Sequence, residues 1–237
     1  MNYISIKIHF ILTLFYFKNT LFCIFIIKVV MQSIQANGYP IHFNEKGYEA
    51  LNLHLKETKY SNLFVLVDTK TNEHCLSKFL PYLETNLTIE IIEFEAGEAN
   101  KNIDTCVEVW KVLTELGADR KSLIVNLGGG VVTDLGGFVA STFKRGVDFV
   151  NIPTTLLAMV DASVGGKNGV DLGNLKNQIG VINVPLMVLV DSSYLVTLPK
   201  NEMRSGLAEM LKHGLIFDKM EWEKFLNLKN IDFADFD

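Results

Sequence analysis

The sequence of 237 residues predicts an α/β fold, in which helices flank a mostly parallel, doubly wound sheet. Short apolar runs that are typical of buried parallel strands alternate along the chain with segments of helical periodicity. One such run, Ser122–Leu127, stops at the glycines 128–130, and apolar residues at helical spacing follow. From Asn201 onward the pattern is helical. We therefore predict a Rossmann-like α/β domain over residues 31–200, followed by the incomplete start of a helical domain over residues 201–237.

The first half of the predicted α/β domain supplies three strands and two helices. Leu63–Asp68 is a continuous apolar run that ends in an acid, as a buried parallel strand does. Thr88–Phe94 alternates between apolar and polar residues, which also indicates a strand. We expect a further strand at Ser33–Phe43 and helices at Glu45–Thr58 and Thr69–Asn86.

The second half continues the alternation. A loop at residues 96–101 leads into a predicted helix at Ile103–Leu116, and three strands follow at Ser122–Leu127, Phe149–Ile152 and Met187–Val190. Polar groups crowd between the last two strands. We expect these segments to be loops that carry a binding site: Pro153–Thr155, Asp161–Lys167 and Lys176–Asn177.

The net charge of −5 is unevenly distributed along the chain. Residues 1–30 carry three lysines and no acid, and the remainder carries 19 basic and 27 acidic residues, a net charge of −8. An acidic body argues against a nucleic-acid surface, so bound anions must be met by particular lysines and arginines.

Three cysteines without a CxxC pair indicate neither a disulfide framework nor a thiolate metal site, which suits a reducing cytoplasm.

Residues 1–30 are rich in Ile and Phe and lack Gly, Pro, Asp and Glu. A membrane anchor needs about 20 continuous apolar residues, and Lys18-Asn19 splits this run. A secretory signal would have a short apolar core and a small-residue cleavage site, which the segment lacks. We favour an upstream extension translated ahead of a start at Met31, and an anchor, a signal or a structural element are the alternatives.

The order of strand, glycine turn and helix at residues 122–139 is the one with which α/β proteins bind phosphate. Glycines let backbone N–H groups approach an anion, and the helix N-terminus adds favourable dipole charge. The turn is not the GxGxxG fingerprint, because Thr133 stands at the third glycine position. A plain strand-to-helix connection is the alternative interpretation.

Other polar residues are candidates for chemistry. Lys167 follows two glycines, so it can lean over a small anionic ligand or be an ordinary surface lysine. Asp161 ends an apolar run and is either a turn residue or a group held in a pocket. Glu209 and His213 are four residues apart on one helix face, which permits a metal pair, although charged residues on a helix are normally solvated.

Seven pieces of the sequence carry a family resemblance. They are Gly97-Glu98-x-x-Lys101, Gly128-Gly-Gly-Val-Val-x-Asp134, Phe143-Lys-Arg145-Gly, Pro153-Thr154-Thr155-Leu-Leu, Asp161-Ala-Ser-Val-Gly-Gly-Lys167, Lys176-Asn177-x-Ile-Gly and Ser205-Gly-Leu-Ala-Glu209-x-x-Lys212. Together, and in this order, they resemble the 3-dehydroquinate synthases, a family of sugar-phosphate cyclases, over about Met31 to Gly214. The resemblance implies an α/β domain that holds NAD and a helical domain that supplies most of a metal site.

The resemblance also implies roles for individual residues. NAD contacts would fall on Asp68, Glu98, Lys101, Gly129, Gly130, Val131, Asp134, Thr154, Thr155, Lys167, Lys176 and Thr197. Substrate and catalytic groups would be Asp161, Lys167, Asn177 and Lys212, with Arg145 on the substrate phosphate, from the same chain or from the second subunit of a homodimer. Glu209 would be one ligand of Zn²⁺ or Co²⁺, whereas His213 matches no ligand position of the family.

The implied reaction converts 3-deoxy-D-arabino-heptulosonate 7-phosphate, a sugar acid phosphate, into 3-dehydroquinate and phosphate in the shikimate pathway. Hydride passes to NAD⁺ from a metal-polarised carbinol, phosphate leaves by elimination, hydride returns, and an aldol step closes the ring. The protein positions the substrate and stabilises its anionic groups.

Two departures from the family pattern bear on this prediction. Thr133 replaces a common glycine and is small enough to be harmless. In the family two zinc histidines lie well beyond the residue that matches Glu209, and this sequence ends at Asp237, 28 residues after it. We therefore expect the chain as given not to turn substrate over.

Two alternative functions remain. They are another cyclase, of the 2-deoxy-scyllo-inosose or valiolone type, and a non-catalytic NAD-binding fragment. Lys167, Asn177 and Lys212 favour dehydroquinate synthase.

Overall fold

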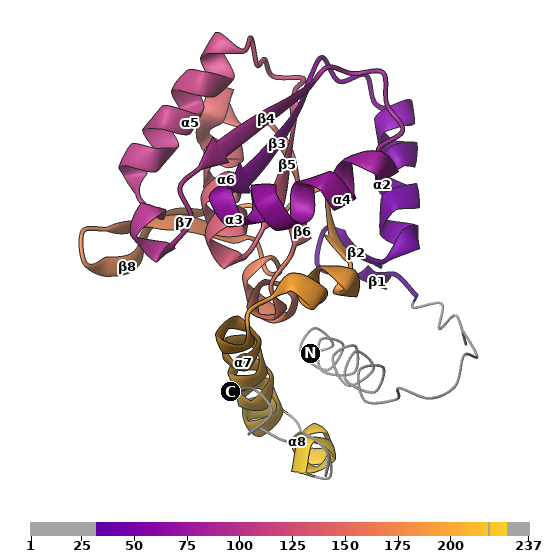
Figure 1. Cartoon of the computed structure of the whole chain (residues 1–237), viewed down its shortest axis with the longest axis vertical. Coiled ribbons are helices and arrows are strands. Elements are labelled where there is room, and N and C mark those ends of the chain that lie inside the picture. The colour runs from indigo at the N-terminus through magenta and orange to yellow at the C-terminus, as the bar shows by residue number, and fades with distance from the viewer. Residues whose placement is uncertain (1–31, 218, 227–237) are drawn as a thin grey trace.

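The structure, a computed structural model, describes residues 32–217 and 219–226. Its centre is a seven-stranded sheet in the order β1-β2-β9-β6-β5-β3-β4 (Figure 1). All neighbouring strands are parallel except β1 and β2, which confirms the predicted fold class. The strands are β1 (Ile34–Gln35), β2 (Pro40–Phe43), β3 (Leu63–Asp68), β4 (Ile89–Phe94), β5 (Leu123–Gly128), β6 (Asp148–Pro153) and β9 (Met187–Val190). The proposed extension at residues 1–30 lies outside the described residues.

Helices cover both faces of the sheet. One face carries α2 and the helical segment 69–82, and the other carries α5 and α6. Segment 69–82 changes its helical type along its length. The helices are α2 (Glu45–Glu57), α3 (Thr69–Thr71), a π-helical turn (Asn72–Leu76), α4 (Ser77–Phe79), a 3₁₀ turn (Leu80–Tyr82), α5 (Ile103–Glu115) and α6 (Gly130–Thr142).

The central strand β3 shows why its sequence is apolar throughout. Adjacent residues of a strand point to opposite faces of the sheet. Leu63, Val65 and Val67 belong to the apolar cluster under α2, whereas Phe64 and Leu66 belong to the cluster under α5 and α6. Both faces of β3 are therefore buried, as expected for a parallel sheet covered on two sides.

A two-stranded antiparallel hairpin, β7 (Lys167–Leu172) and β8 (Leu175–Ile182), packs against α6 where we expected loops. Most of β8 is exposed, and the polar run Lys176–Gln178 interrupts the apolar pattern expected of a strand. Its pairing depends on glycines that bring the two backbones together. A Cβ on Gly180 would lie 2.4 Å from the carbonyl oxygen of Asn168. The loop prediction for this segment was therefore wrong.

Two predicted boundaries also differ from the structure. Residues 33–43 form two short strands rather than one, because Gly38, with a φ of 94°, turns the chain between them. The helix that was predicted at residues 69–86 ends in the structure at Tyr82, which is the last residue of a 3₁₀ turn that contains Pro81. The other predicted strands and helices agree with the structure to within about two residues, the usual uncertainty of such boundaries.

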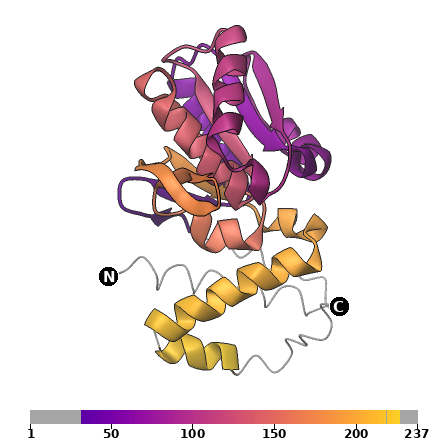
Figure 2. The same ribbon diagram turned by 90° about the vertical axis from the view of Figure 1, so that its left-hand side faces the viewer.

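After the sheet the chain forms α7 (Lys200–Phe217) and α8 (Lys219–Leu226), and the described residues beyond 200 include no strand. Figure 2 shows α7 running across the end of the α/β layers. Gly206 packs directly on the segment after β6, since a Cβ there would lie 2.5 Å from the Cβ of Leu156. This close packing holds one face of α7 against the π-helical turn Ala158–Ala162.

Candidate functional site

The order of the strands in the sheet changes direction between β3 and β5. β4 pairs with one side of β3, β5 pairs with the other side, and β6 and β9 continue away from it. In open α/β sheets ligands bind outside the carboxyl ends of the strands at such a switch point. Asp68 ends β3 and Gly128 ends β5. The glycine turn therefore occupies the position where this class of fold binds ligands.

The glycine turn leaves no room for side chains. A Cβ on Gly129 would lie 2.9 Å from Cγ2 of Thr155, and a Cβ on Gly130 would lie 3.3 Å from the Cβ of Ala162. Gly129 is the N-cap of α6, and no side chain caps the helix. Because the first N–H groups of a helix have no partner within it, those of Gly130 and Val131 can bind an anion. We call this turn, Gly128–Val131, the anion cradle.

A buried lysine links the loop before α5 to α6 and to the hairpin. Lys101 is 4% exposed, forms an ion pair with Asp134, and donates a hydrogen bond of 2.7 Å to Oδ1 of Asn177. Asn177 has a φ of 54°, and its N–H donates to Oδ1 of Asp171 at 2.7 Å. A left-handed non-glycine residue costs on the order of 1–3 kcal/mol and is often found at functional sites. The network thus fixes Asn177 in a definite orientation.

The carboxyl group of Asp134 lies in a setting that disfavours its charged form. Burial raises its pKa to about 6, and the nearby ammonium group of Lys101 offsets only part of that effect. Removing both members of an ion pair from water costs more than their attraction returns unless further hydrogen bonds support them. Asp134 therefore changes its charge close to neutral pH.

Glu98 and Lys176 meet at the outer side of the site. Glu98 follows Gly97, which has a φ of 114° and so requires glycine. The ammonium group of Lys176, on β8, lies 2.8 Å from the Glu98 carboxylate, and both side chains are largely exposed. Such a pair contributes little stability, so both groups can turn to a ligand at small cost.

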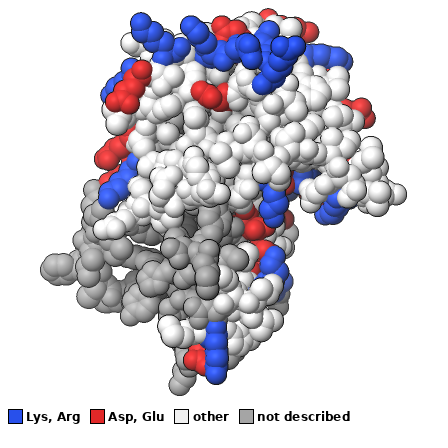
Figure 3. All heavy atoms as spheres, turned by 180° about the vertical axis from the view of Figure 1, so that it is seen from behind, with Lys and Arg blue, Asp and Glu red and all other residues white. Residues whose placement is uncertain are grey.

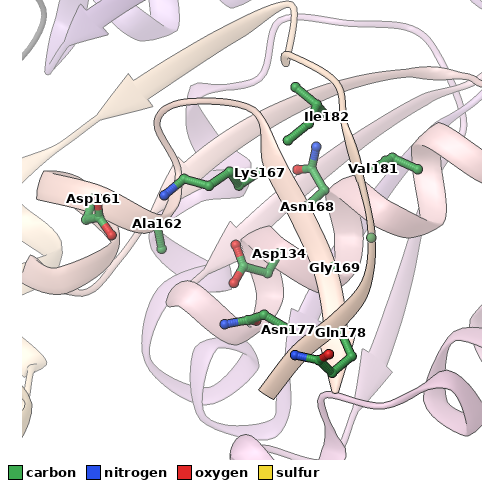
Figure 4. A pocket seen from close by; sticks show the side chains of 11 residues that line it. Asp134, Asp161, Ala162, Lys167, Asn168, Gly169, Asn177, Gln178, Val181 and Ile182 are labelled. Carbon is green, nitrogen blue, oxygen red and sulfur yellow. The ribbon is translucent and has the colours of Figure 1, made fainter. Parts of the chain in front are cut away.

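A cavity of about 440 Å³ lies between α6, the π-helical turn and the hairpin. Figure 4 shows the ammonium end of Lys167 pointing toward Asp161, with Asp134 and Asn177 together further along the cavity. One ammonium group, two carboxylates and three side-chain amides thus line one space, which suits a polar ligand. The lining residues are Asp134, Asp161, Ala162, Lys167, Asn168, Gly169, Asn177, Gln178, Gly180, Val181 and Ile182.

A second group of polar side chains lies where α7 meets the π-helical turn. One carboxylate oxygen each from Asp161 and Glu209 and a ring nitrogen of His213 lie within 4.8 Å of one another. We call these three side chains the acid–histidine cluster. The Nε2 atom of His213 is 3.3 Å from Oε1 of Glu209 and 3.9 Å from Oδ1 of Asp161. His213, which matched no ligand position, is therefore not remote from the predicted metal residue.

Lys212 lies beside this cluster, on the same helix. Its ammonium group forms an ion pair with Glu209, and this contact raises the pKa of the lysine. The side chain is about half exposed, at 51%, whereas that of Glu209 is 16% exposed. A cation therefore already faces the carboxylate that was predicted to bind a metal.

Four other predicted cofactor residues follow the carboxyl ends of strands. Asp68 caps α3 by accepting the N–H of Thr71 at 2.7 Å. The N–H of Thr154 donates to the carbonyl of Gly128 at 2.9 Å, which places Thr154 and its neighbour Thr155 beside the cradle. Thr197 is exposed after β9, and its hydroxyl donates to a backbone carbonyl at 3.2 Å. Their roles in binding a cofactor stay predictions.

Arg145 is the predicted substrate residue that the structure does not bring to the cradle. It lies just beyond the last residue of α6, whereas Gly130 is the first. The 13 residues of α6 span about 20 Å, so Arg145 lies near the amino edge of the sheet. Figure 3 shows lysines and arginines gathered at the end of the molecule remote from α7. Within its own chain Arg145 is too far away to meet an anion in the cradle.

Sequence reasoning overlooked Asn168 and, after considering His213 as one of a metal pair, assigned it no role. The Nδ2 group of Asn168 donates to the carbonyls of Gly166 and Asn183, at 3.1 and 2.7 Å, and so ties the hairpin together. A lone asparagine carries no pattern that would have revealed this role. His213 did carry a signal, its spacing of four residues from Glu209 on a helix, but its approach to Asp161 depends on tertiary packing.

The fold and the site define a Rossmann-like α/β protein with a glycine turn at its switch point. Residues 91–205 match a family model described as 3-dehydroquinate synthase N-terminal. The chain belongs to the 3-dehydroquinate synthase family. It is 48% identical over 164 residues to the 3-dehydroquinate synthase of Parabacteroides distasonis, covering 68% of this chain and 46% of the relative. It is 41% identical over 199 residues to that of Acetivibrio thermocellus, covering 81% and 53%. The chain thus spans about half the length of the curated relatives it matches.

Solved structures show the same fold. A 2-epi-5-epi-valiolone synthase from Streptomyces hygroscopicus, with NAD⁺ and Zn²⁺ bound, is 29% identical with a TM-score of 0.66, covering 77% of this chain and 51% of that one. A 2-deoxy-scyllo-inosose synthase complexed with carbaglucose-6-phosphate, NAD⁺ and Co²⁺ is 24% identical with a TM-score of 0.70, covering 76% and 51%. Within residues 32–217 and 219–226, no helix is both long and apolar enough to cross a membrane.

Proposed function

We propose that this chain forms the NAD-binding and substrate-binding part of a 3-dehydroquinate synthase, a phosphate-eliminating lyase. Such an enzyme converts 3-deoxy-D-arabino-heptulosonate 7-phosphate into 3-dehydroquinate and phosphate. The observation that carries the proposal is that three separate features of the structure lie together. The anion cradle, the Lys167 cavity and the acid–histidine cluster meet at one edge of the sheet, in a chain up to 48% identical to relatives of that name.

The residues present fit NAD. A side chain on Gly129 would crowd Thr155, and the backbone N–H groups of the cradle suit the pyrophosphate. Asp68 and Glu98 follow neighbouring parallel strands, where acids commonly accept hydrogen bonds from ribose hydroxyls. The two related cyclases described above contain NAD⁺. We assign Thr154, Thr155, Lys176 and Thr197 to the same cofactor because they surround this edge.

The residues present also fit a divalent metal, since two carboxylates and an imidazole are a common donor set. When bound, NAD⁺ accepts and returns a hydride, and the metal polarises a substrate hydroxyl. Glu209 is the ligand implied by the family resemblance.

The chain's own side chains position the substrate. Lys167 on β7 shares a cavity with Asp161, and Lys212 on α7 pairs with Glu209 of the neighbouring cluster, so we assign the two ammonium groups to the carboxylate and phosphate of one substrate. Asn177 accepts a hydrogen bond from Lys101 through Oδ1, which leaves the two Nδ2 hydrogens for a substrate oxygen. Fixed cations in a partly enclosed site stabilise the charge that develops as phosphate leaves.

Another sugar-phosphate cyclase is the second candidate, because solved valiolone and inosose synthases share the fold. The identity to the valiolone synthase is 29%, against 41–48% to the dehydroquinate synthases quoted above. The family assignment and the paired lysines favour a substrate with both a carboxylate and a phosphate. A non-catalytic NAD-binding role is the third candidate.

The remaining proposals concern partners and location. A homodimer would bring Arg145 of one subunit to the other subunit's substrate. The acidic net charge of the chain supports a small-molecule partner rather than nucleic acid. The buried, reduced thiols of Cys75 and Cys106 support a cytoplasmic location.

Calorimetric titration of the full chain tests the proposed function. We expect one-to-one binding of NAD⁺. In its presence we expect the heptulosonate phosphate to bind at least ~10-fold more tightly than glucose 6-phosphate, because only the former carries a carboxylate for the second lysine. The reverse order would favour an inosose-type cyclase, and binding of NAD⁺ without either sugar phosphate would favour the non-catalytic role.

A further inference from the structure

The β7–β8 hairpin departs from regular pairing close to its turn. Two steps along β7, from Val170 to Leu172, correspond to four steps along β8, from Ile179 to Leu175. The two extra residues make β8 bulge out of the ladder around Asn177, whose φ of 54° belongs to the left-handed region. Bulges are common beside active sites, where they change the direction of a side chain. Asn177 thus leaves the ladder in the segment in which it lines the cavity.

Asp171, the β7 residue opposite this bulge, accepts a hydrogen bond in place of the interrupted ladder. Its Oδ1 atom accepts the N–H of Asn177 at 2.7 Å, and its own N–H donates to the carbonyl of Lys101 at 2.9 Å. The ammonium group of Lys101 in turn donates to Oδ1 of Asn177 at 2.7 Å. These three hydrogen bonds form a closed ring, in which each residue is bonded to the other two.

We propose that Asp171 is a positioning residue for the sugar phosphate, which acts through Asn177 and does not touch the ligand itself. Asp171 is not among the residues that line the cavity, and sequence reasoning gave it no role. The inference rests on the proposed function, in which the Nδ2 group of Asn177 binds a substrate oxygen. It deepens that function by naming the residue that holds this donor in place.

The ring holds Asn177 by both its backbone and its side chain. Asp171 binds the N–H, and Lys101 binds Oδ1 of the amide. Lys101 cannot follow a moving asparagine, because it is 4% exposed and is also paired with Asp134. The Nδ2 group of Asn177 is thereby left as a fixed donor beside the cavity. A donor that is fixed before the ligand arrives loses less conformational entropy on binding, so it contributes more affinity.

Asp171 is itself held by the start of α5. It forms an isolated parallel bridge with Asn102, which caps that helix by accepting the N–H of Thr105 at 2.9 Å. The carboxylate of Asp171 is therefore anchored to the loop that carries Lys101. A hydrogen bond from a backbone N–H to a carboxylate is stronger than one to a neutral carbonyl. This strength offsets part of the cost of the left-handed backbone at Asn177.

A double-mutant cycle in the full chain tests the proposal, with calorimetric titration of the heptulosonate phosphate at saturating NAD⁺. Asp171→Ala removes the acceptor and should weaken binding of the sugar phosphate ~10-fold. Asn177→Gly removes the amide, adopts a φ of 54° without strain, and should weaken binding at least as much. Because Asp171 acts through Asn177, Asp171→Ala should have no further effect in the Asn177→Gly protein. An equal loss in both backgrounds would overturn the proposal.

Two further variants separate positioning from a general loosening of the hairpin. Asp171→Asn keeps an Oδ1 atom that can accept the N–H of Asn177, so it should bind the sugar phosphate within ~3-fold of the wild type. Asn174→Ala, at an exposed position in the turn of the same hairpin, should bind as the wild type does. Circular dichroism should show all variants folded. If Asp171→Asn bound as weakly as Asp171→Ala, the proposed role of the acceptor would be wrong.

A measurement without any ligand distinguishes this inference from the proposed function. The amide proton of Asn177 should exchange with solvent at least ~10-fold faster in Asp171→Ala than in the wild type, because its acceptor is gone. Equal exchange would refute the inference by itself. Equal binding of the sugar phosphate by wild type and Asp171→Ala would also refute it and leave the proposed function standing, whereas a wild type that bound no sugar phosphate would refute both.

Discussion

At the scale of single residues, the anion cradle depends on positions where a side chain cannot be added. Gly129→Val should weaken NAD⁺ binding at least ~10-fold, since its Cβ would meet Thr155 at 2.9 Å and its methyl groups would enter the ligand's path. Calorimetric titration measures the loss. Gly129→Val combined with Thr155→Ala removes the contact within the protein but keeps the methyl groups in the cradle. Full affinity in a folded Gly129→Val protein would show that NAD⁺ binds elsewhere.

Asp134 gives a prediction about pH. Its pKa is raised from 3.8 to about 6 by burial, so between these values the native state binds more protons than the unfolded state. The stability contributed by this group is therefore largest at low pH and declines as pH rises through the folded pKa. Relative to Asp134→Asn, the wild type should be more stable at pH 5 than at pH 8, by about 1 kcal/mol.

Urea unfolding of both metal-free proteins at the two pH values measures this difference. The comparison cancels other titrating groups, which the two proteins share. A stability difference that grows with pH would mean that the ion pair with Lys101 outweighs burial, and that the pKa of Asp134 is lowered rather than raised.

Single-residue signals in the sequence had clear limits. Lys167, Asp161 and Glu209 were picked out because of preceding glycines, the end of an apolar run and helical spacing. The structure places Asp161 in one cavity with Lys167 and within 4.8 Å of Glu209. His213 was set aside because it matches no ligand position of the family. Its approach to Asp161 is made by the packing of two segments about 50 residues apart. Local patterns carry periodicity but not such tertiary contacts.

At the scale of helices and strands, the buried elements were predicted more accurately than the exposed ones. β3 and β9 were predicted to the residue, because strands buried on both faces must be continuously apolar. The hairpin β7–β8 escaped prediction because polar residues interrupt both strands, β8 is largely exposed, and the register depends on close glycine contacts. Since Lys167 and Asn177 lie on these strands, the least predictable element carries part of the site.

The contact between α7 and the sheet leads to a prediction about this helix as a whole. Gly206→Ala should push α7 away from the segment after β6, because the new Cβ would lie 2.5 Å from the Cβ of Leu156 and 2.8 Å from the N–H nitrogen of Leu157. Overpacking of this kind costs about 1–3 kcal/mol. We expect weaker Co²⁺ binding and unchanged NAD⁺ binding, because the cradle is built by α6.

Ser205→Ala is the control for this prediction, since Ser205 is the exposed neighbour of Gly206 on the same helix. It should leave both affinities unchanged. If Gly206→Ala bound Co²⁺ as tightly as the wild type, the packing of α7 would not determine the geometry of the acid–histidine cluster.

At the scale of the whole molecule, the predicted binding residues divide between two ends. The parallel strands deliver Asp68, Glu98, the cradle and Thr154 to their carboxyl ends, because parallel strands all end at the same edge. Arg145 lies about 20 Å away at the other end of α6. A sequence motif cannot show that separation, because it records order along the chain and not the direction of each helix.

Arg145 therefore gives a prediction about assembly, which rests on the proposed function. We expect its guanidinium to meet the substrate phosphate of a second copy of the chain. Arg145→Ala should weaken binding of the heptulosonate phosphate at least ~10-fold, as expected for the loss of a charge-assisted contact, and leave NAD⁺ affinity unchanged. Lys144→Ala, at the exposed neighbouring residue, should change neither.

Mixing two defective chains distinguishes a contribution in trans from one in cis. In a dimer of Arg145→Ala with Lys167→Ala, one of the two sites combines the intact Lys167 of the first chain with the intact Arg145 of the second. Random pairing of equal amounts should therefore restore tight binding in about a quarter of all sites, which the stoichiometry of a calorimetric titration reports. If Arg145 acted within its own chain, every site would contain one of the two defects, and mixing would restore none.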